Sequence, residues 1–285
     1  MDCKLSFCLS FSGMIIRIVL PKVAHLPDAL TTFLCDDPGI VDAEYEIFLI
    51  NRPLCPNSQP IHNEQGILIY ATEEGWLRIY RPLIEADGCQ VACLLCPDGK
   101  NKLYYPEAKW DYYAEQLNFL HLIAIETPLL QRNAFLLHSS VVLWNGKTIL
   151  FSGPSGAGKS TQAQLWQTHL HAKILNGDRC VVMKKGDGFY GGGSPWSGTS
   201  GIYDPDQAPI AAIFLVHQAD ENRVTALGRG AFAPLFSQTV VNSWDPNFMA
   251  QITDLFSELI GQVPIYRLDC RPDENAVMTA LNAIL

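Results

Sequence analysis

Short apolar runs separated by turn-forming residues dominate the first hundred positions of the chain. Apolar, β-branched and aromatic residues gather at 14–20, 46–50, 66–70, 76–80 and 90–95, and Asn57-Ser58, Asp87-Gly88 and Pro97-Asp98-Gly99 lie between these runs. Runs of this length, bounded by turn formers, are typical of β-strands. The pattern therefore predicts a β-rich N-terminal domain over residues 1–105.

A helical period replaces the strand pattern after residue 105. Between residues 106 and 127, apolar side chains recur every three or four positions, at Trp110, Tyr113, Leu117, Leu120 and Ala124. Pro106 suits the first turn of such a helix, and Pro128 is expected to end or kink it. We therefore predict a connecting helix within residues 106–133 and a second domain over residues 134–285.

Strand and helix patterns alternate within residues 134–285, which is typical of the α/β class. Asn145-Gly146, the strongest signal for a two-residue hairpin, joins the strands expected at 135–144 and 147–152. Further strands are expected at 172–175, 180–183, 211–216 and 264–268, and helices at 160–170, 232–241, 247–260 and 272–285. An antiparallel hairpin thus leads into the segment that follows residue 152.

That segment, Gly-Pro-Ser-Gly-Ala-Gly-Lys-Ser-Thr, fits the phosphate-loop pattern G-x-x-x-x-G-K-[ST] without a mismatch. Its glycines let the backbone curl so that several amides face one anion, and the next helix turns its positive end toward that anion. Lys159 would reach the β- and γ-phosphates, and the Ser160 hydroxyl would ligate Mg²⁺. The candidate nucleotide-binding residues are Gly153, Pro154, Ser155, Gly156, Ala157, Gly158, Lys159, Ser160 and Thr161. The alternative is a plain glycine-rich turn.

Asp178 follows the strand expected at 172–175, in the sequence Asn-Gly-Asp-Arg. A carboxylate at a strand end beside a phosphate loop is where a second Mg²⁺ ligand belongs. The alternative is a turn aspartate that hydrogen-bonds its own backbone. The glycine-rich stretch 191–198 is expected to be either a mobile active-site loop or a surface turn.

The amino-acid composition indicates which kinds of protein and partner are compatible with this chain. Hydrophobic residues make up 48% and charged residues 17% of the chain, which is enough apolar material for a sizeable core. The net charge of −9 argues against a nucleic-acid partner. No stretch reaches the ~20 apolar residues of a membrane span, and serines break the apolar run at 5–11, unlike a signal peptide. The 9 scattered cysteines favour reduced thiols and a cytoplasmic location.

Three of these cysteines, Cys89, Cys93 and Cys96, have the C-x3-C-x2-C spacing of enzymes that hold an iron–sulfur cluster. The residues between them suit a strand, on which Cys93 and Cys96 would face opposite sides. We therefore predict packing cysteines, with an iron–sulfur enzyme as the alternative.

The ordered set of features resembles the catalytic domain of the HPr serine kinase/phosphorylase family, whose phosphate-loop fold is shared with phosphoenolpyruvate carboxykinases. The similar features are the hairpin that enters the loop, His138 on its first strand, the loop itself, and the strand ending in Asp178-Arg179. Ser194-Pro195-Trp196 and residues 271–277 look like features of smaller divergent relatives. The resemblance covers about residues 134–285 and implies a nucleotide-binding catalytic domain with a mixed sheet.

Two positions depart from that family's pattern. HPr kinases usually carry two adjacent aspartates where this chain has Gly177-Asp178, and their loop ends in Lys-Ser-Glu where this one ends in Lys159-Ser160-Thr161. HPr is therefore a poor candidate for the substrate.

The resemblance implies a kinase that uses Mg²⁺ and ATP, with GTP as the alternative donor. The acceptor would be a hydroxyl group, on a serine of a peptide or protein or on a small molecule. The candidate catalytic residues are Asp178, His138 and Lys159, the candidate Mg²⁺ ligands are Ser160 and Asp178, and Arg179 and Arg229 are candidates to touch the transferred phosphoryl group.

Other functions stay open at this point. A regulatory module that binds nucleotide without transferring phosphate is the main alternative, and a decarboxylating, carboxykinase-like enzyme is a further one. No membrane partner is expected, and self-association into a homo-oligomer is left open.

Overall fold

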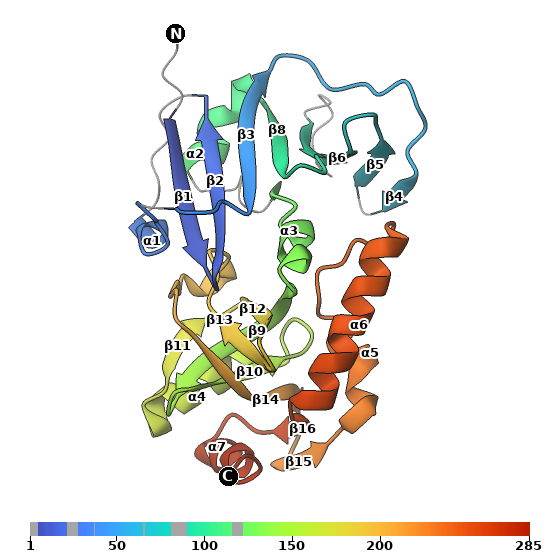
Figure 1. Ribbon diagram of the computed structural model, residues 1–285. Coiled ribbons are helices and arrows are strands. Elements are labelled where there is room, and N and C mark those ends of the chain that lie inside the picture. Colours follow the sequence, from blue (N-terminus) through green and yellow to red (C-terminus); the bar gives the residue numbers. More distant parts are fainter. Residues whose placement is uncertain (1–4, 22–27, 37, 65, 81–89, 116–121) are drawn as a thin grey trace. The chain divides into compact units, whose positions relative to one another are not determined.

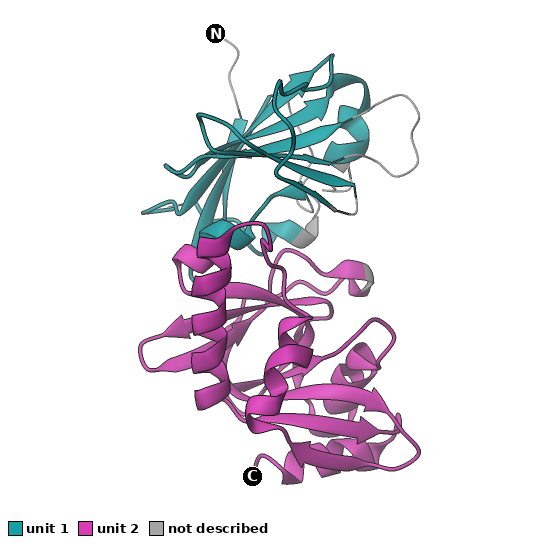
Figure 2. Cartoon of the chain, turned by 90° about the vertical axis from the view of Figure 1, so that its right-hand side faces the viewer, with its two compact units in different colours: residues 1–128 teal, residues 129–285 magenta. Residues whose placement is uncertain are grey.

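A computed structural model describes residues 5–21, 28–36, 38–64, 66–80, 90–115 and 122–285. The chain divides into two compact units, Met1–Pro128 and Leu129–Leu285 (Figure 2). The division lies inside the predicted connecting segment 106–133. Within the described residues each unit holds one eight-stranded sheet with parallel and antiparallel neighbours, which confirms the predicted α/β class and mixed sheet.

The sheet of the first unit follows the apolar runs of the sequence (Figure 1). Its strand order is β1-β2-β3-β8-β7-β6-β5-β4. The bounds are β1 Leu5–Phe11, β2 Met14–Leu20, β3 Ala43–Ile50, β4 His62–Glu64, β5 Ile67–Ala71, β6 Trp76–Tyr80, β7 Val91–Leu95 and β8 Lys100–Pro106, with a short helix α1 at Asp28–Thr31. Neighbours are antiparallel except β2–β3 and β3–β8. The serine-interrupted run at the start of the chain is therefore a paired strand.

The continuous helix predicted over residues 106–127 is wrong. The structure has a 3₁₀ turn at Glu107–Lys109, helix α2 at Trp110–Glu115 and helix α3 at Glu126–Gln131. Pro128 lies in the first turn of α3 and does not end a helix. Proline is tolerated there because the first four amides of a helix have no intrahelical acceptor. The predicted helical positions Leu117 and Leu120 lie outside the described residues.

A buried ion pair joins α3 to the sheet of the first unit. The Arg78 guanidinium on β6 donates to the Glu126 carboxylate, and their side chains are 10% and 4% exposed. Burial is the largest single effect and lowers the pKa of Arg78, but Glu126 together with Tyr80 and Cys93 more than offsets it, so this pKa is raised overall. The Tyr45 hydroxyl also donates to the Ala124 carbonyl at 3.2 Å. These contacts hold the start of α3 within the first unit.

The predicted hairpin is at the centre of the sheet of the second unit. The strand order is β10-β9-β12-β13-β14-β16-β15. In addition β10 pairs with β14 and β11 pairs with β9, so the hairpin has neighbours on both sides. The bounds are β9 Ala134–Trp144, β10 Lys147–Ser152, β11 Lys173–Asn176, β12 Arg179–Lys185, β13 Gly188–Gly192, β14 Gln207–Gln218, β15 Arg223–Ala226 and β16 Ile265–Cys270. Asn145 and Gly146 take φ values of 48° and 74°, as a type I′ turn requires. Because β10, β14 and β16 are parallel neighbours, their carboxyl ends share one edge of the sheet.

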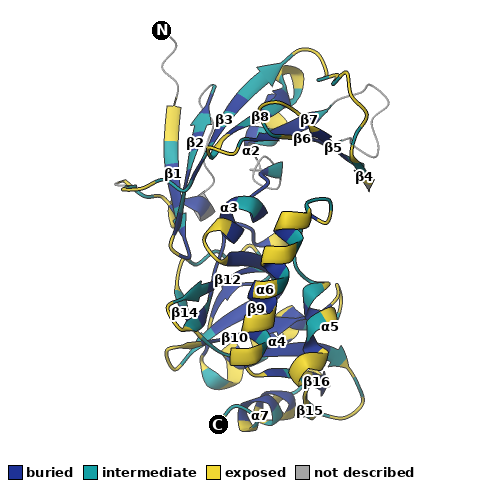
Figure 3. Ribbon diagram, turned by 45° about the vertical axis from the view of Figure 1, so that its right-hand side comes forward, coloured by how far each residue is buried: buried dark blue, intermediate teal, exposed yellow. Residues whose placement is uncertain are grey.

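Helices cover both faces of this sheet (Figure 3). Helices α4, Lys159–Leu170, and α7, Glu274–Asn282, contribute to the core on one face, and α6, Pro246–Gln262, and α5, Phe232–Phe236, to the core on the other. Trp166 of α4 is fully buried against the rings of Trp144 and Phe151. This packing anchors the helix that begins directly after the phosphate loop. Among the described residues, no helix has the length and apolar character needed to cross a membrane.

The helix predicted over residues 232–241 is too long. It ends at Phe236, and the chain then runs beside β9, where His138 N donates to the Gln238 carbonyl at 2.8 Å and Val240 N donates to the Leu136 carbonyl at 3.3 Å. Buried backbone groups of β9 need partners, and the extended segment supplies them. The polar residues 237–239 consequently lie beside the strand that carries His138.

Candidate active site

The phosphate-loop segment turns sharply between β10 and α4. Gly153, Gly156 and Gly158 have φ values of 145°, 78° and 104°, which residues with side chains rarely adopt. A Cβ at Gly153 would also lie 3.2 Å from the Val216 carbonyl oxygen on the neighbouring strand β14. Gln218, at the end of β14, donates from Nε2 to the Gly156 carbonyl at 2.8 Å. The glycines of the motif thus serve both the curl of the loop and its close approach to β14.

A hollow of about 500 Å³ lies beside this loop. The candidate nucleotide-binding residues that line it are Ser155, Gly156, Gly158, Lys159, Ser160 and Thr161. His138 from β9 and Asp178 from the turn before β12 line the same hollow. The structure therefore brings together side chains from three separate parts of the chain, at residue 138, at residues 155–161 and at residue 178. Ala157 instead lines a neighbouring hollow of about 610 Å³.

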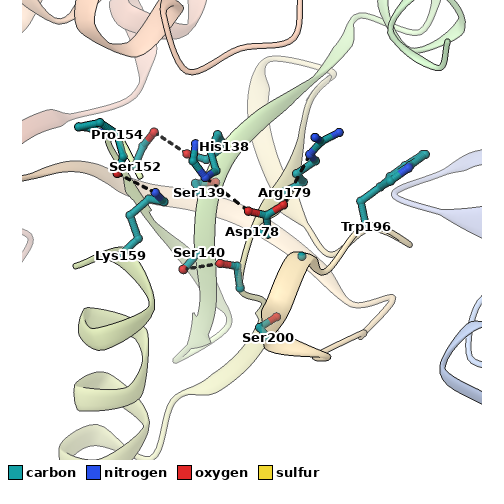
Figure 4. Close-up of polar contacts among 12 residues, drawn as sticks. His138, Ser139, Ser140, Ser152, Pro154, Lys159, Asp178, Arg179, Trp196 and Ser200 are labelled. Carbon is teal, nitrogen blue, oxygen red and sulfur yellow. Dashed lines mark hydrogen bonds and ion pairs between the residues drawn. The ribbon is translucent and has the colours of Figure 1, made fainter. Parts of the chain in front are cut away.

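The Lys159 ammonium folds back onto the loop (Figure 4). Its Nζ donates to the carbonyls of Gly153 and Pro154, both at 3.0 Å, and the residue is 7% exposed. Removal from water lowers the pKa of Lys159, and the charge of Asp178 opposes this shift. Both hydrogen-bond acceptors are neutral, so they leave the positive charge of Lys159 uncancelled.

His138, Asp178 and Arg179 form a polar row across β9 and β12 (Figure 4). His138 Nε2 lies 3.4 Å from Asp178 Oδ1, and Arg179 Nε lies 3.6 Å from Asp178 Oδ2. The strand register pairs His138 with Arg179, which explains why the three groups meet. The hydrogen bond with His138 lowers the pKa of Asp178 most, burial opposes it, and the charges of Arg179 and Lys159 lower it further. Asp178 is therefore held as a carboxylate.

Asn176 fixes the position of this row, a role that sequence reasoning missed. It is fully buried, and its Oδ1 accepts from the backbone amides of Asp178 and Arg179, both at 2.8 Å. Its Nδ2 donates to the carbonyls of Ser194 and Trp196, both at 3.0 Å. Asn-Gly-Asp is a recognisable turn signal, but the contacts to residues 194 and 196 depend on the fold. Because the side chain of Asn176 accepts the hydrogen bonds that hold this turn, the Asp178 carboxylate is left to face His138.

The glycine-rich stretch 191–198 is not the surface turn that the sequence left open, and its Ser197 lines the hollow beside the phosphate loop. Residues 191–197 are buried, and the Ser194 hydroxyl donates to the Arg179 carbonyl at 2.7 Å. A Cβ at Gly193 would lie 1.9 Å from the Asp204 carbonyl oxygen, so the backbones approach too closely for any side chain. The stretch is a packed wall behind the Asn176 turn.

Two glycines beside the Asp178 turn stand where the structure leaves no room for a side chain. A Cβ at Gly177 would lie 2.5 Å from Ser200 Cβ, and a Cβ at Gly198, where φ is 56°, would lie 2.7 Å from Asp178 Cγ. A second aspartate at position 177, as in HPr kinases, would therefore require Ser200 to move. Among the described residues that line the hollow, Asp178 is the one acidic side chain.

Other sequence candidates lie elsewhere. Arg229 is exposed in a 3₁₀ turn, Gly228–Ala231, and does not line either hollow. Cys93 is buried in β7 and Cys96 is partly buried, while Cys89 lies outside the described residues. Within the part of the chain that the structure describes, no group of three or more His, Cys, Asp or Glu side chains is placed to hold a metal ion by itself.

A comparison with known protein families shows which family the chain belongs to. The family described as SynChlorMet cassette protein ScmC matches residues 109–272, more than half of the chain. The chain belongs to the ScmC family. The matched range contains the phosphate loop, His138 and Asp178, so the candidate site lies in the part that this family shares. No curated protein sequence matches the chain.

Among solved structures, this member of the ScmC family is similar to the Hpr(Ser) kinase/phosphatase from Coxiella burnetii. The similarity covers 52% of this chain and 95% of that chain, with 8% sequence identity and a TM-score of 0.31. A likeness at this level supports no conclusion about activity, and the expected relation to HPr kinases stays a prediction.

Proposed function

We propose that this ScmC-family protein is a kinase that transfers the γ-phosphate of ATP, or alternatively GTP, to a hydroxyl group. The observation that carries the proposal is the convergence of Lys159, Ser160 and Asp178 on one hollow beside a curled phosphate loop. The acceptor is a serine of a peptide or protein, or a small molecule.

The loop and the start of α4 would bind the triphosphate. Gly158 stands at the N-cap of α4 without a side-chain cap, which leaves the first amides of the helix to hydrogen-bond phosphate oxygens. Lys159 would exchange its two neutral carbonyl acceptors for a charged phosphate, and such hydrogen bonds are shorter and stronger. Triphosphate binding would therefore draw Lys159 out of the loop and toward the γ-phosphate.

The donor set beside the hollow fits Mg²⁺. Ser160 and Asp178 offer hard oxygen ligands, and Mg²⁺ commonly binds one or two carboxylates together with substrate phosphates and water. A lone carboxylate is thus sufficient, although the described residues hold no larger cluster of metal-binding side chains. When bound, the ion would neutralise charge on the β- and γ-phosphates.

A neighbouring hollow of about 610 Å³ would take the nucleoside. It borders the same loop through Gly158 and lies at the carboxyl ends of β14 and β16, where open α/β sheets bind ligands. Gln162 is 2% exposed and lines this hollow, and its Oε1 has no hydrogen-bond partner among the described residues. Asp220 and Arg271 add charged groups that could bind the base and the ribose.

The transfer step follows from these positions. The acceptor oxygen attacks the γ-phosphorus while the bond to the β,γ-bridging oxygen breaks, and ADP leaves with that electron pair. The acceptor proton passes to the His138–Asp178 pair. Because its pKa is lowered, Asp178 stays ionised and stabilises the imidazolium that forms. Lys159 balances the negative charge that moves toward the leaving oxygen.

Ligand-dependent thermal unfolding tests the first step. We expect Mg·ATP or Mg·GTP at about 100 times its Kd to stabilise the wild type by about 2.7 kcal/mol, and to stabilise Lys159→Ala much less. Lys147→Ala is the matched control, because Lys147 is exposed on the hairpin that leads into the phosphate loop and lines neither hollow. Equal stabilisation of wild type and Lys159→Ala, or none of either, contradicts the proposal.

A second measurement separates transfer from simple binding. Loss of the ATP γ-phosphate that requires an added hydroxyl compound, and that disappears in Lys159→Ala and Asp178→Ala, is expected for a kinase. Nucleotide binding without acceptor-dependent loss of that phosphate would instead identify a regulatory binding module.

A further inference from the structure

The His138–Asp178 pair stands between two hollows. One is the hollow beside the phosphate loop, and the second, of about 260 Å³, is lined by Leu136, Arg179 and residues 237–240. His138 and Asp178 are the described residues that line both. If nucleotide fills the first hollow, the second gives another molecule access to the same proton-accepting pair.

The backbone holds the wall of the second hollow in place. The segment 237–240 pairs with β9 through the Leu137–Thr239 bridge, and His138 N donates to the Gln238 carbonyl at 2.8 Å. The wall is therefore attached to the strand that carries His138. A molecule bound against this wall would therefore be held in a fixed position relative to the His138 imidazole.

The side chains of this hollow suit a small anion. Arg179 lines it but does not line the hollow beside the loop, and in the described part of the chain its charged partner is Asp178. The side chain of Arg179 is 36% exposed, so guanidinium donors are accessible. Thr239 Oγ1 is buried without a hydrogen-bond partner among the described residues. Planar guanidinium groups bind carboxylate and phosphate through paired hydrogen bonds.

We propose that the second hollow binds the phosphate acceptor, a small hydroxyl compound that carries an anionic group, with Arg179 binding the anion and the hydroxyl reaching His138 and Asp178. This inference rests on the proposed kinase function. Asp178 would repel an anion at its own end of the hollow, so the anionic group binds at Arg179 and the neutral hydroxyl faces the pair. The volume of about 260 Å³ favours a free small molecule over a folded protein surface.

Acceptor kinetics test the assignment with glycerol, D-glycerate, glycerol 3-phosphate and a serine-containing peptide blocked at both ends. We expect the wild type to prefer glycerate or glycerol 3-phosphate over glycerol by about tenfold or more in kcat/KM. Arg179→Gln should raise KM for the anionic acceptors by about 10- to 100-fold, change kcat little, and leave glycerol unaffected. The ratio between glycerate and glycerol 3-phosphate identifies which anion is preferred.

Two further variants keep the test decisive. Arg229→Gln is the matched control, because this arginine is exposed and lines none of the three hollows. Thr239→Val keeps the shape of the side chain and should raise KM for every acceptor. If Arg179→Gln is inactive, titration of D-glycerate onto protein saturated with a non-hydrolysable ATP analogue should still show weaker binding than in the wild type.

Equal use of glycerol and its anionic relatives, or transfer to the blocked peptide alone, overturns the acceptor assignment while nucleotide stabilisation remains. Loss of nucleotide stabilisation in the wild type overturns the kinase proposal itself. The two failures are therefore distinguishable in the same set of proteins.

Discussion

Substitution of Gly198 by alanine tests whether the position of Asp178 matters, without changing any charged residue. Gly198 has a φ of 56°, and a Cβ there would lie 2.7 Å from Asp178 Cγ and 2.8 Å from Asp178 Cβ. Atoms this close cannot coexist, and because Asp178 Cβ is fixed by its own backbone, the backbone around Gly198 or Asp178 must shift and change the position of the carboxylate relative to His138. The nearby Gly201 has a φ of 63°, but a Cβ there would meet nothing within 4 Å.

The two glycines make a matched pair. Each alanine substitution carries the left-handed backbone penalty of about 1–2 kcal/mol. Gly198→Ala adds about 1–3 kcal/mol for the overlap with Asp178, so we expect it to destabilise the protein by about 2–5 kcal/mol in total. Gly201→Ala should stay at about 1–2 kcal/mol. The difference between the two variants measures the displacement of Asp178.

Activity should separate the variants further. A displacement of about 1 Å at a catalytic group can cost about 100-fold in rate, so kcat should fall by about 10- to 100-fold in Gly198→Ala and little in Gly201→Ala. Stabilisation by nucleotide without Mg²⁺ should survive in both, because the phosphate loop is untouched. Denaturant unfolding and steady-state transfer assays provide these values. Equal unfolding free energies and equal kcat for the two variants would refute the reasoning.

Two other expectations follow from the charged groups. Glu126→Ala should destabilise the protein by about 3–5 kcal/mol in denaturant unfolding, because it removes the carboxylate that faces the buried Arg78 charge, whereas Glu74→Ala, at an exposed pair, should change little. If both variants unfold alike, the buried pair does not stabilise the fold. Because burial lowers the pKa of Lys159 below the usual value for lysine, nucleotide affinity measured over a range of pH should be full at low pH and fall as pH rises through that lowered pKa. Lys159→Arg stays charged, so its affinity measured over the same range should not change, and a similar fall in both proteins would contradict this.

The sequence by itself determined the elements with strong local signals. The Asn145-Gly146 turn, the strands on either side of it and the curled glycines of the phosphate loop were predictable, because hairpin geometry and positive φ restrict residue choice locally. The strand pattern of the first unit was predictable for the same reason. The helix predicted over 106–127 failed because a period of apolar positions does not reveal where the chain changes direction.

The tertiary structure decided which side chains meet. Asp178 faces His138 because β9 and β12 pair in one register and because Asn176 supplies the hydrogen bonds of the turn, and no local signal contains either fact. The segment 237–240 lines the second hollow only because its backbone pairs with β9, more than 90 residues earlier in the chain. Local sequence restricts backbone conformation, whereas strand pairing between distant segments determines the neighbours of each polar group, and with them the chemistry of the site.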